Sequence, residues 1–239
     1  MSIDPIEQRW IDLDERIIAC RKCPRLVAYR EEIGRKKKRA YMDWRYWARP
    51  VPGFGDHHGR VLIVGLAPGA HGANRTGRMF TGDSSGNFLF RALYKAGFAN
   101  QPTAHDRDDG LELHDLYIAA VCRCAPPDNK PTRDEILNCR PYLLEELELL
   151  GKVKVVVVLG RIAFDDVIAV YRQQGHAIPR LEFMHGAVYP LGEGMPTLVC
   201  SYHPSQQNTQ TGRLSEAMFD QIWERVRTIL NAHPRGTIL

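Results

Sequence analysis

Apolar residues follow two spacings along this chain, and their alternation predicts strands separated by helices. Short continuous apolar runs predict buried strands at residues 60–64, 115–121, 152–159 and 197–202. Helical spacing of apolar residues predicts helices at residues 5–19, from 84 or 85 onward, and at 133–150, 162–172 and 214–230. A capping-box pattern, Thr132 with Glu135, marks the start of the third helix. We expect residues 175–195, which show neither spacing, to be irregular.

Strands that alternate with helices predict an α/β protein. The expected architecture is a three-layer α/β/α sandwich around a four-stranded, mainly parallel sheet. A chain of 239 residues, 44% of them hydrophobic, is long enough for one large core, and we expect a single domain over residues 1–239. No segment resembles a signal peptide or reaches the ~18 apolar residues of a membrane span. We therefore expect a monomeric, cytoplasmic protein that does not enter membranes.

A glycine-rich stretch, GLAPGAHGANRTGRMFTGD at residues 65–83, joins the first strand to the next helix. Glycine allows close approach of a ligand to the backbone and conformations with positive φ. Open α/β sheets bind their ligands at the carboxyl ends of strands, where this stretch lies. It matches neither the dinucleotide motif nor the phosphate loop, so it predicts a binding site without naming the ligand. A nucleotide-binding enzyme remains an alternative.

Two further residues are candidates for chemistry at the same sheet edge. His203 follows the last predicted strand, in the segment SYHPS, and a histidine there faces the glycine-rich stretch across the strand ends. The alternative is a purely structural histidine. Asp83 ends the glycine-rich stretch just before a helix, where aspartate is also a good N-cap. The two roles of Asp83 are compatible.

Six cysteines in a chain without secretory features point to metal binding or buried thiols rather than disulfides. Cys20 and Cys23 form a C-x-x-C turn, while Cys124 and Cys139 flank the start of a helix. Two such pairs can converge on structural zinc or on an iron–sulfur cluster, and spacing does not decide between them. Ordinary buried thiols are the alternative. We interpret Cys122 and Cys200, which lie in strand patterns, as core residues.

Positive charge is concentrated in the run RKKKR at residues 35–39, which precedes Tyr41, Trp44, Tyr46 and Trp47. Positive charge beside flat aromatic rings suits a nucleic-acid backbone. The alternative is a solvated charge run next to aromatics that pack on the core. The formal net charge of +4 is only mildly basic, so the position of this run matters more than the total.

The ordered set of motifs resembles family 5 of the uracil-DNA glycosylase superfamily, the iron–sulfur enzymes often called type B. The resemblance covers nearly the whole chain. It rests on C-x-x-C-P-R-L at Cys20 to Leu26, YWARPVPGFGD, the glycine-rich stretch, RCAPPDNKPT with NCRPY, LGRIA and SYHPSQQNTQTGRL. The fold of that family agrees with the sandwich predicted above.

The resemblance implies a [4Fe-4S] cluster on Cys20, Cys23, Cys124 and Cys139. It also implies that Phe80 stacks on an extruded base, that His203 hydrogen-bonds the departing base, and that Asp83 positions water near the sugar C1′. Other residues are implied to line the base pocket. With Phe80 they are Gly65, Gly69, Ala70, Ala120 and Asn208.

Two departures from related families bear on specificity. Leu66 and Ala67 stand where other branches carry an acid, and Ala120 stands where many carry an asparagine that reads the uracil edge. The implied activity is removal of uracil, hypoxanthine, xanthine and other deaminated bases from DNA, which leaves an abasic site without strand cleavage by a lyase step. The alternative is a non-catalytic nucleic-acid-binding protein whose four cysteines hold a structural metal.

Overall fold

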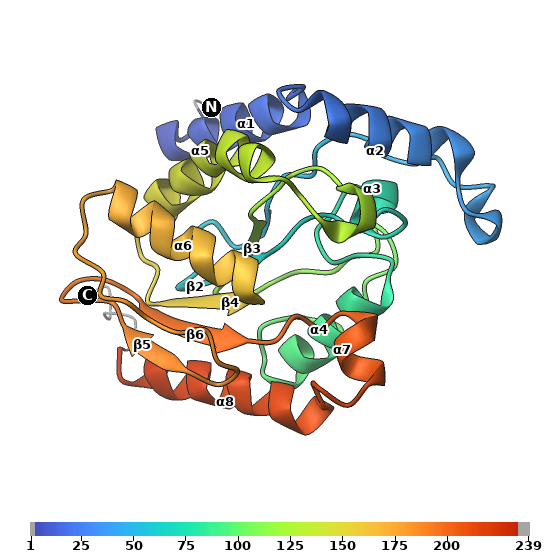
Figure 1. Cartoon of the computed structure of the whole chain (residues 1–239). Coiled ribbons are helices and arrows are strands. Elements are labelled where there is room, and N and C mark those ends of the chain that lie inside the picture. Colours follow the sequence, from blue (N-terminus) through green and yellow to red (C-terminus); the bar gives the residue numbers. More distant parts are fainter. Residues whose placement is uncertain (1–2, 234–239) are drawn as a thin grey trace.

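The computed structural model describes residues 3–233 and forms an α/β/α sandwich (Figure 1). The strands are β1 (Phe54–Gly55), β2 (Val61–Gly65), β3 (Leu116–Ala120), β4 (Val155–Leu159), β5 (Val188–Pro190) and β6 (Thr197–Ser201). The helices are α1 (Pro5–Ile18), α2 (Pro24–Lys36), α3 (Ala73–Thr76), α4 (Ser84–Lys95), α5 (Arg133–Leu150), α6 (Arg161–Gln173), α7 (Gln206–Gln210) and α8 (Glu216–Asn231). Two 3-10 turns are added, η1 (Arg39–Tyr41) and η2 (Pro127–Asn129).

The sheet has the strand order β1-β3-β2-β4-β6-β5. Its four central strands are mutually parallel, as the apolar runs predict, and every residue of β2, β3 and β4 is buried. The outermost strands β1 and β5 pair antiparallel with their neighbours and are only two and three residues long. Short edge strands limit pairing with other chains.

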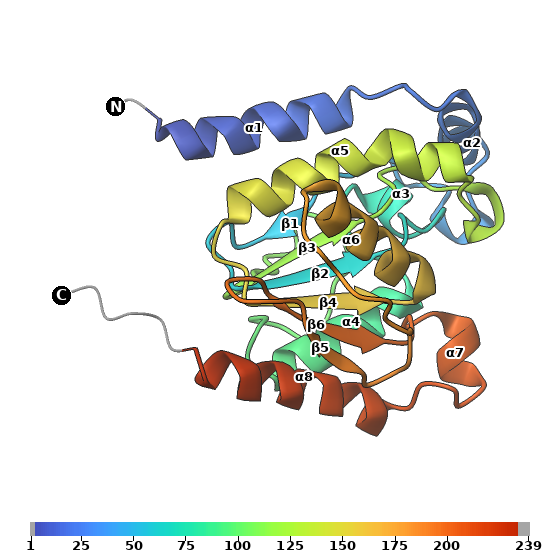
Figure 2. The same cartoon turned by 60° about the vertical axis from the view of Figure 1, so that its left-hand side comes forward.

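Alternate residues of the strands face two separate hydrophobic cores. Ile63, Ile118 and Val157 pack with α4 and α8 on one face of the sheet. Leu62 and Val156 point to the other face, where α1, α5 and α6 cover them. Figure 2 shows these two helical layers above and below the sheet. Both faces are therefore buried, which explains the continuous apolar runs.

The predicted elements are confirmed with end points that shift by a few residues, and the capping box of α5 is present. Thr132 Oγ1 accepts the Glu135 N–H at 3.3 Å, and the Glu135 carboxylate accepts the Thr132 N–H at 2.7 Å. The sheet has six strands rather than the four expected, because the prediction misses both short edge strands, β1 and, in the segment 175–195 expected to be irregular, β5. Helix α2 was also missed, and α3 and α7, with four and five residues, are too short to show a helical period.

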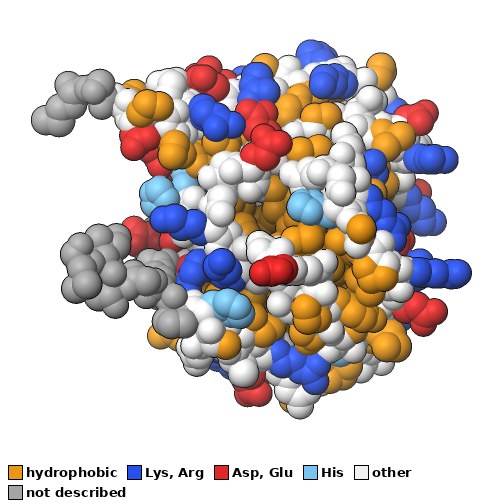
Figure 3. Space-filling view, turned by 90° about the vertical axis from the view of Figure 1, so that its left-hand side faces the viewer, with side chains coloured by type: hydrophobic (Ala, Val, Ile, Leu, Met, Phe, Trp, Pro, Cys, Tyr) orange, Lys and Arg blue, Asp and Glu red, His pale blue; other side chains and the backbone are white. Residues whose placement is uncertain are grey.

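No helix among residues 3–233 has the length and apolar character that a membrane span requires. The four central strands point to the right in Figure 1, so their amino ends lie at the opposite side. Figure 3 views the molecule from that side and shows acidic and basic side chains interspersed over the surface. The surface at the amino ends of the central strands therefore carries charges of both signs.

Candidate active site

The carboxyl ends of the four parallel strands bring the candidate residues to one edge of the sheet. Gly65, the last residue of β2, pairs with Ala120, the last residue of β3. Leu159 of β4 pairs with Ser201 of β6, two residues before His203. The glycine-rich stretch at residues 65–83, here called the pocket loop, and His203 therefore lie at the same edge, as the sequence predicts.

Asp83 caps helix α4, and its carboxylate also fills a space that two glycines leave open. Its Oδ1 accepts the Gly86 N–H at 3.0 Å, which confirms the N-cap interpretation. A Cβ atom at Gly69 would lie 2.8 Å from Asp83 Oδ2, and one at Gly72 would collide with that oxygen. These two glycines are therefore required for the carboxylate to lie against the pocket loop.

Burial gives this carboxyl unusual acid–base properties. Burial raises the pKa of Asp83 above its ordinary value, while the Gly86 and Ser85 N–H groups and the Arg75 charge lower it in part. A buried carboxylate that is only partly compensated is typical of functional sites. The catalytic role of Asp83 stays a prediction; burial disfavours its ionised form, and the two N–H groups and the Arg75 charge offset that effect in part.

Phe80 occupies a strained backbone position and presents its ring to the strand ends. Its φ of 51° is in the left-handed region, which a bulky residue rarely adopts. A Cβ atom at Gly65 would lie 2.8 Å from Phe80 Cζ, so the ring packs where Gly65 has no side chain. The Phe80 and His203 ring centroids are 5.9 Å apart with 29° between the planes.

His203 is held from its backbone and kept neutral by burial. Asn208 Nδ2 donates to the His203 carbonyl at 2.9 Å, and the Asn208 N–H donates to Ser205 Oγ at 3.4 Å at the start of α7. Burial lowers the pKa of His203 to about 4. At neutral pH the imidazole therefore has one N–H donor and one acceptor nitrogen.

The remaining predicted pocket residues contribute backbone and small side chains. Ala120 is 1% exposed at the end of β3 and carries only a methyl group there. The Ala70 carbonyl accepts Asn74 Nδ2 at 3.4 Å, and the Gly69 carbonyl accepts the Asn74 N–H at 3.0 Å. Gly65, Gly69, Ala70, Phe80, Asp83, Ala120, His203 and Asn208 thus belong to one continuous region.

Arg75 is a pocket-loop residue that the sequence analysis missed. Its Nε donates to the His71 carbonyl at 2.8 Å and its Nη2 donates to the Gly82 carbonyl at 2.8 Å. The guanidinium carbon also lies 4.0 Å from the ring centroids of both Tyr41 and Trp44. This one side chain therefore closes the pocket loop and joins it to the aromatic residues Tyr41 and Trp44. Because these partners lie about thirty residues upstream, no local sequence pattern reveals the role of Arg75.

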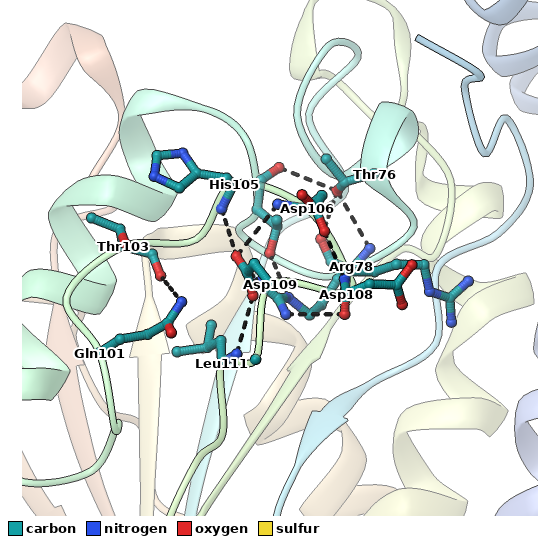
Figure 4. Close-up of polar contacts among 12 residues, drawn as sticks. Thr76, Arg78, Gln101, Thr103, His105, Asp106, Asp108, Asp109 and Leu111 are labelled. Atoms are coloured by element: carbon teal, nitrogen blue, oxygen red, sulfur yellow. Dashed lines mark hydrogen bonds and ion pairs between the residues drawn. The ribbon is translucent and has the colours of Figure 1, made fainter.

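A second arginine braces the pocket loop from the other side, as Figure 4 shows. Arg78 Nη2 forms an ion pair with Asp109, and Arg78 Nε donates to Thr81 Oγ1 at 2.9 Å. Asp109 also accepts the backbone N–H groups of His105 and Leu111 at 2.7 and 3.1 Å. Asp109 thus orders the polar connection after α4 and fixes the backbone next to Phe80.

The four predicted cysteine ligands lie in one neighbourhood. Cys23 and Cys124 form a small buried cluster with Leu26. Burial raises the pKa of the Cys124 thiol to about 12, and the thiols of Cys139 and Cys20 are close enough to raise it further. The same two cysteines influence the pKa of Cys23. Cys200, in β6, and Cys122, two residues after β3, are fully buried, as expected for core residues, and the Cys122 thiol hydrogen-bonds with that of Cys139.

The groups around these thiols fit an anionic ligand set. Arg30 is 2% exposed, makes no ion pair with any described carboxylate, and donates from Nη1 to Cys124 Sγ at 2.8 Å. Asn138 Nδ2 lies 3.6 Å from Cys23 Sγ. A buried cation needs a compensating charge, and Cys124 would supply one only as a thiolate, the form in which a cysteine binds a metal. Within residues 3–233, no group of three or more His, Cys, Asp or Glu side chains is arranged to hold a metal ion.

The basic run lies next to the pocket loop. The backbone N–H of Lys38 donates to Tyr46 Oη at 3.4 Å, and that oxygen is 2.9 Å from His71 Nδ1 in the pocket loop. Lys38 and Arg39 are exposed and form no ion pair within the described part of the chain, whereas Lys36 pairs with Glu32. The free cations are therefore presented beside the pocket.

Comparison with known proteins finds a matching family profile and several similar relatives. The profile of the uracil DNA glycosylase superfamily matches residues 52–227, which include the pocket loop and His203 but not Cys20 and Cys23. A type-5 uracil-DNA glycosylase of Thermus thermophilus is 53% identical over 209 residues, which span 87% of this chain and 92% of the relative.

Two relatives from one organism show that the likeness differs between types. A type-5 uracil-DNA glycosylase of Pyrobaculum aerophilum is 44% identical over 90% of this chain and 90% of its own length. A type-4 uracil-DNA glycosylase of the same organism is 30% identical over 81% of each chain. The match to type 5 is therefore the stronger of the two.

Proposed function

This chain belongs to the uracil-DNA glycosylase superfamily, and we propose that it removes uracil and other deaminated bases, including hypoxanthine and xanthine, from DNA. It acts as a monofunctional glycosylase, which hydrolyses the N-glycosidic bond and leaves an abasic site. The observation that carries the proposal is the convergence of Asp83, Phe80 and His203 at the carboxyl edge of the sheet. A carboxylate, a stacking ring and a neutral hydrogen-bond donor are what this reaction needs.

Hydrolysis of the bond develops positive charge on the sugar and negative charge on the base. As in other glycoside hydrolysis, the transition state resembles an oxocarbenium ion. Ionised Asp83 orients the attacking water and stabilises the positive charge near C1′. Asp83 is suited to this because its Oδ2 lies against Gly69 and Gly72 while its Oδ1 caps α4.

His203 acts on the departing base. As a neutral imidazole, it donates a hydrogen bond to a base oxygen that becomes more negative in the transition state, and a preorganised donor of this kind is typically worth 10²–10³ in rate. Asn208 holds the His203 backbone, and Phe80 stacks on the extruded base. No protonated histidine is required at neutral pH.

The breadth of the base preference rests on Ala120. This residue offers no side-chain hydrogen bond to a base edge and occupies little volume at the end of β3. Sites that hydrogen-bond a substrate group reject analogues far more strongly than apolar sites do. The pocket therefore accepts deaminated purines as well as uracil, and Ala120→Asn shifts the preference towards uracil.

Cys20, Cys23, Cys124 and Cys139 hold a [4Fe-4S] cluster in this proposal. The buried cation Arg30 and the Asn138 amide, both directed at the thiol sulfurs, support an anionic thiolate set. When bound, the cluster supplies structural cross-linking rather than chemistry on the substrate. These residues then fasten the turn between α1 and α2 to the start of α5.

DNA is the macromolecular partner, and the chain works as a cytoplasmic monomer. The free cations Lys38 and Arg39 lie next to the pocket loop, where they neutralise phosphates on either side of an extruded nucleotide. Extrusion of the nucleotide costs a few kcal/mol, least at a mismatch such as U·G.

The test is incubation of the protein with duplexes that carry a single uracil, hypoxanthine or xanthine, followed by alkali and strand analysis. Alkali-labile breaks at the lesion are expected, whereas strands without alkali treatment stay intact. Binding of all duplexes without any alkali-labile site would instead support the non-catalytic alternative. Cleavage of uracil with no detectable cleavage of hypoxanthine opposite thymine would contradict the role given to Ala120.

A further inference from the structure

The strand end beside His203 is completed by a side chain. Strands β5 and β6 pair antiparallel, and backbone bonds extend this pairing beyond β5: the Cys200 N–H donates to the Ala187 carbonyl at 2.9 Å, and the Gly186 N–H donates to the Cys200 carbonyl at 2.8 Å. Gly186 has a φ of 78°, so the chain before it departs from strand geometry. Every second residue of a strand directs its N–H to the same neighbour, so the Tyr202 N–H points to this side, where the backbone pairing has ended.

His185 supplies the acceptor at that point. The Tyr202 N–H donates to His185 Nδ1 at 3.1 Å, and the two rings are stacked, with centroids 5.0 Å apart and 22° between their planes. The Tyr202 carbonyl accepts a hydrogen bond from Ser201 Oγ at 2.9 Å. Tyr202, the residue directly before His203, is therefore held at its N–H, its carbonyl and its ring.

Helix α8, which lies beneath β5 and β6 in Figure 2, fixes the state of the His185 ring. A hydrogen bond joins the ring to the Met218 backbone. Because Nδ1 accepts the Tyr202 N–H, the donor in this bond is Nε2. Burial, with a smaller contribution from the Arg225 charge, lowers the pKa of His185, and the bond to Met218 offsets this in part. The ring is therefore neutral at pH 7, with Nδ1 able to accept.

The ring of His203 depends on this backbone for its direction. No hydrogen bond to the His203 ring is formed within residues 3–233, and the ring lies beside that of Phe80, with 5.9 Å between the centroids. Asn208 holds the His203 carbonyl, on the far side of the residue from Tyr202. We propose that His185 is a positioning residue for His203: by accepting the Tyr202 N–H, it fixes the strand end from which the His203 ring reaches the departing base.

This inference rests on the proposed function, because a fixed imidazole matters to catalysis only if it acts on a base. A hydrogen-bond donor stabilises the transition state best when it is already aligned with the oxygen that becomes negative. A displacement of about 1 Å can cost 10²-fold in rate even when its cause lies away from the reacting atoms. Loss of the His185 acceptor should therefore lower the cleavage rate by about ten- to a hundred-fold and leave DNA affinity nearly unchanged.

The experiment separates the two hydrogen bonds of His185 by three substitutions. His185→Asn keeps a side-chain oxygen near the position of Nδ1, whereas His185→Gln places its polar atoms near the position of Nε2. His185→Phe keeps a flat ring and removes both bonds. His176→Phe is the matched control, because His176 also contacts a tyrosine ring, that of Tyr171 at 5.9 Å between centroids, but is exposed and lies outside the site.

Single-turnover cleavage of a U·G duplex is measured for each variant, alone and combined with His203→Ala, together with DNA affinity and Tm. We expect His185→Phe and His185→Gln to lose about ten- to a hundred-fold in rate, whereas His185→Asn keeps most of the rate and His176→Phe all of it. Combined with His203→Ala, His185→Phe should cause no further loss, because a positioning residue acts through the group that it positions. Equal rates for His185→Asn and His185→Gln, or a loss of the same factor with and without His203, would overturn the proposal.

Exchange of the Tyr202 amide with deuterated solvent tests the contact without any reaction. Exchange should be slow in the wild type and in His185→Asn and fast in His185→Gln and His185→Phe, and slow exchange in all four proteins would contradict the proposal. If His185→Phe does not fold, the comparison of His185→Asn with His185→Gln decides. If the wild-type protein cleaves no lesion, the proposed function fails, while amide exchange still decides whether His185 holds this strand end.

Discussion

The pocket edge and the cysteine neighbourhood each bury an ionisable side chain, an acid in the first and a cation in the second. At the pocket edge a half-buried acid, Asp83, lies against glycines and two backbone N–H groups, and burial raises its pKa. In the cysteine neighbourhood a buried base, Arg30, has no carboxylate partner in the described residues and points at Cys124. In the first region burial works against the negative charge of a carboxylate, while in the second a buried positive charge lies against a thiol sulfur.

The regions also differ in how they are assembled. The pocket loop is one continuous segment to which a single strand end adds His203. The cysteine neighbourhood instead joins α2, the segment after β3 and the first part of α5. The two regions meet where Asn74 Nδ2 donates to the Arg30 carbonyl at 3.3 Å. Through this contact a structural change in either region can reach the other.

The largest expected effect is replacement of a predicted cluster ligand, such as Cys124→Ser. It should remove the broad visible absorption of the purified protein. Because loss of a structural metal site can exceed 4–5 kcal/mol, Tm should fall by roughly 10 °C or more. The measurements are the visible spectrum, the iron content and thermal unfolding.

Two buried cysteines outside the set serve as controls for that loss. Cys122→Ser and Cys200→Ser change equally buried thiols and should leave the colour intact. A colourless wild-type protein that is stable and holds one zinc would contradict the proposed cluster. Colour lost equally in all three variants would show only a general sensitivity of the core.

The next effect concerns the acid limb of the pH–rate profile. Because the pKa of Asp83 is raised above 3.8, cleavage should begin to fall at a higher pH than an ordinary aspartate would give, by about tenfold per unit below that pKa. The Asp83→Asn variant should lack this limb. Single-turnover rates from pH 4 to 8 decide the matter, and an acid limb that persists in Asp83→Asn would assign it to another group.

Ionisation of Asp83 should affect stability in the opposite direction from activity: it supports cleavage but lowers the stability of the folded state. A carboxyl with a raised folded pKa favours the folded state below its unfolded pKa, and this contribution is lost as pH rises through the folded value. Ionised Asp83 therefore destabilises the fold at neutral pH. Asp83→Asn, which retains an oxygen to cap α4, should unfold at or above the wild-type temperature at pH 7.

The smallest effect is on the salt dependence of binding. Replacement of Lys38 and Arg39 by glutamine should lower the log–log slope by about 1.8, since each phosphate contact on duplex DNA contributes about 0.9. Lys152→Gln is the control, because Lys152 is exposed near the amino end of β4. An unchanged slope in the double variant would show that Lys38 and Arg39 do not contact DNA phosphates and that the basic run is an ordinary solvated surface.

Much of the fold can be predicted because each parallel strand is buried on both faces and is marked by a continuous apolar run. Thr132 and Glu135 even fix the first residue of α5. The edge strand β5 escapes prediction because it is only three residues long, is largely exposed and ends in a proline, which is uncommon inside strands. Its strand geometry depends on pairing with β6, which no local pattern encodes.

The residues of the candidate site also divide into those that the sequence predicts and those that it does not. Asp83, Phe80 and His203 stand in recognisable motifs at strand ends, so the sequence predicts their convergence. Arg75 and Arg30 were missed because their partners lie about thirty and ninety residues away in the chain. Long-range contacts of a single charged side chain leave no pattern in the sequence. The glycines that make room for Asp83, in contrast, stand out as a local cluster.

The most direct test of the central claim is single-turnover cleavage of a U·G duplex by Asp83→Asn and His203→Ala, with DNA affinity and Tm measured on the same preparations. We predict that each variant binds DNA and stays folded, while its cleavage rate falls by about 10²–10³, the usual loss for a preorganised electrostatic group. Near-wild-type cleavage by Asp83→Asn would reduce Asp83 to a helix cap. A rate loss in His203→Ala that is matched by lost folding would contradict a chemical role for His203.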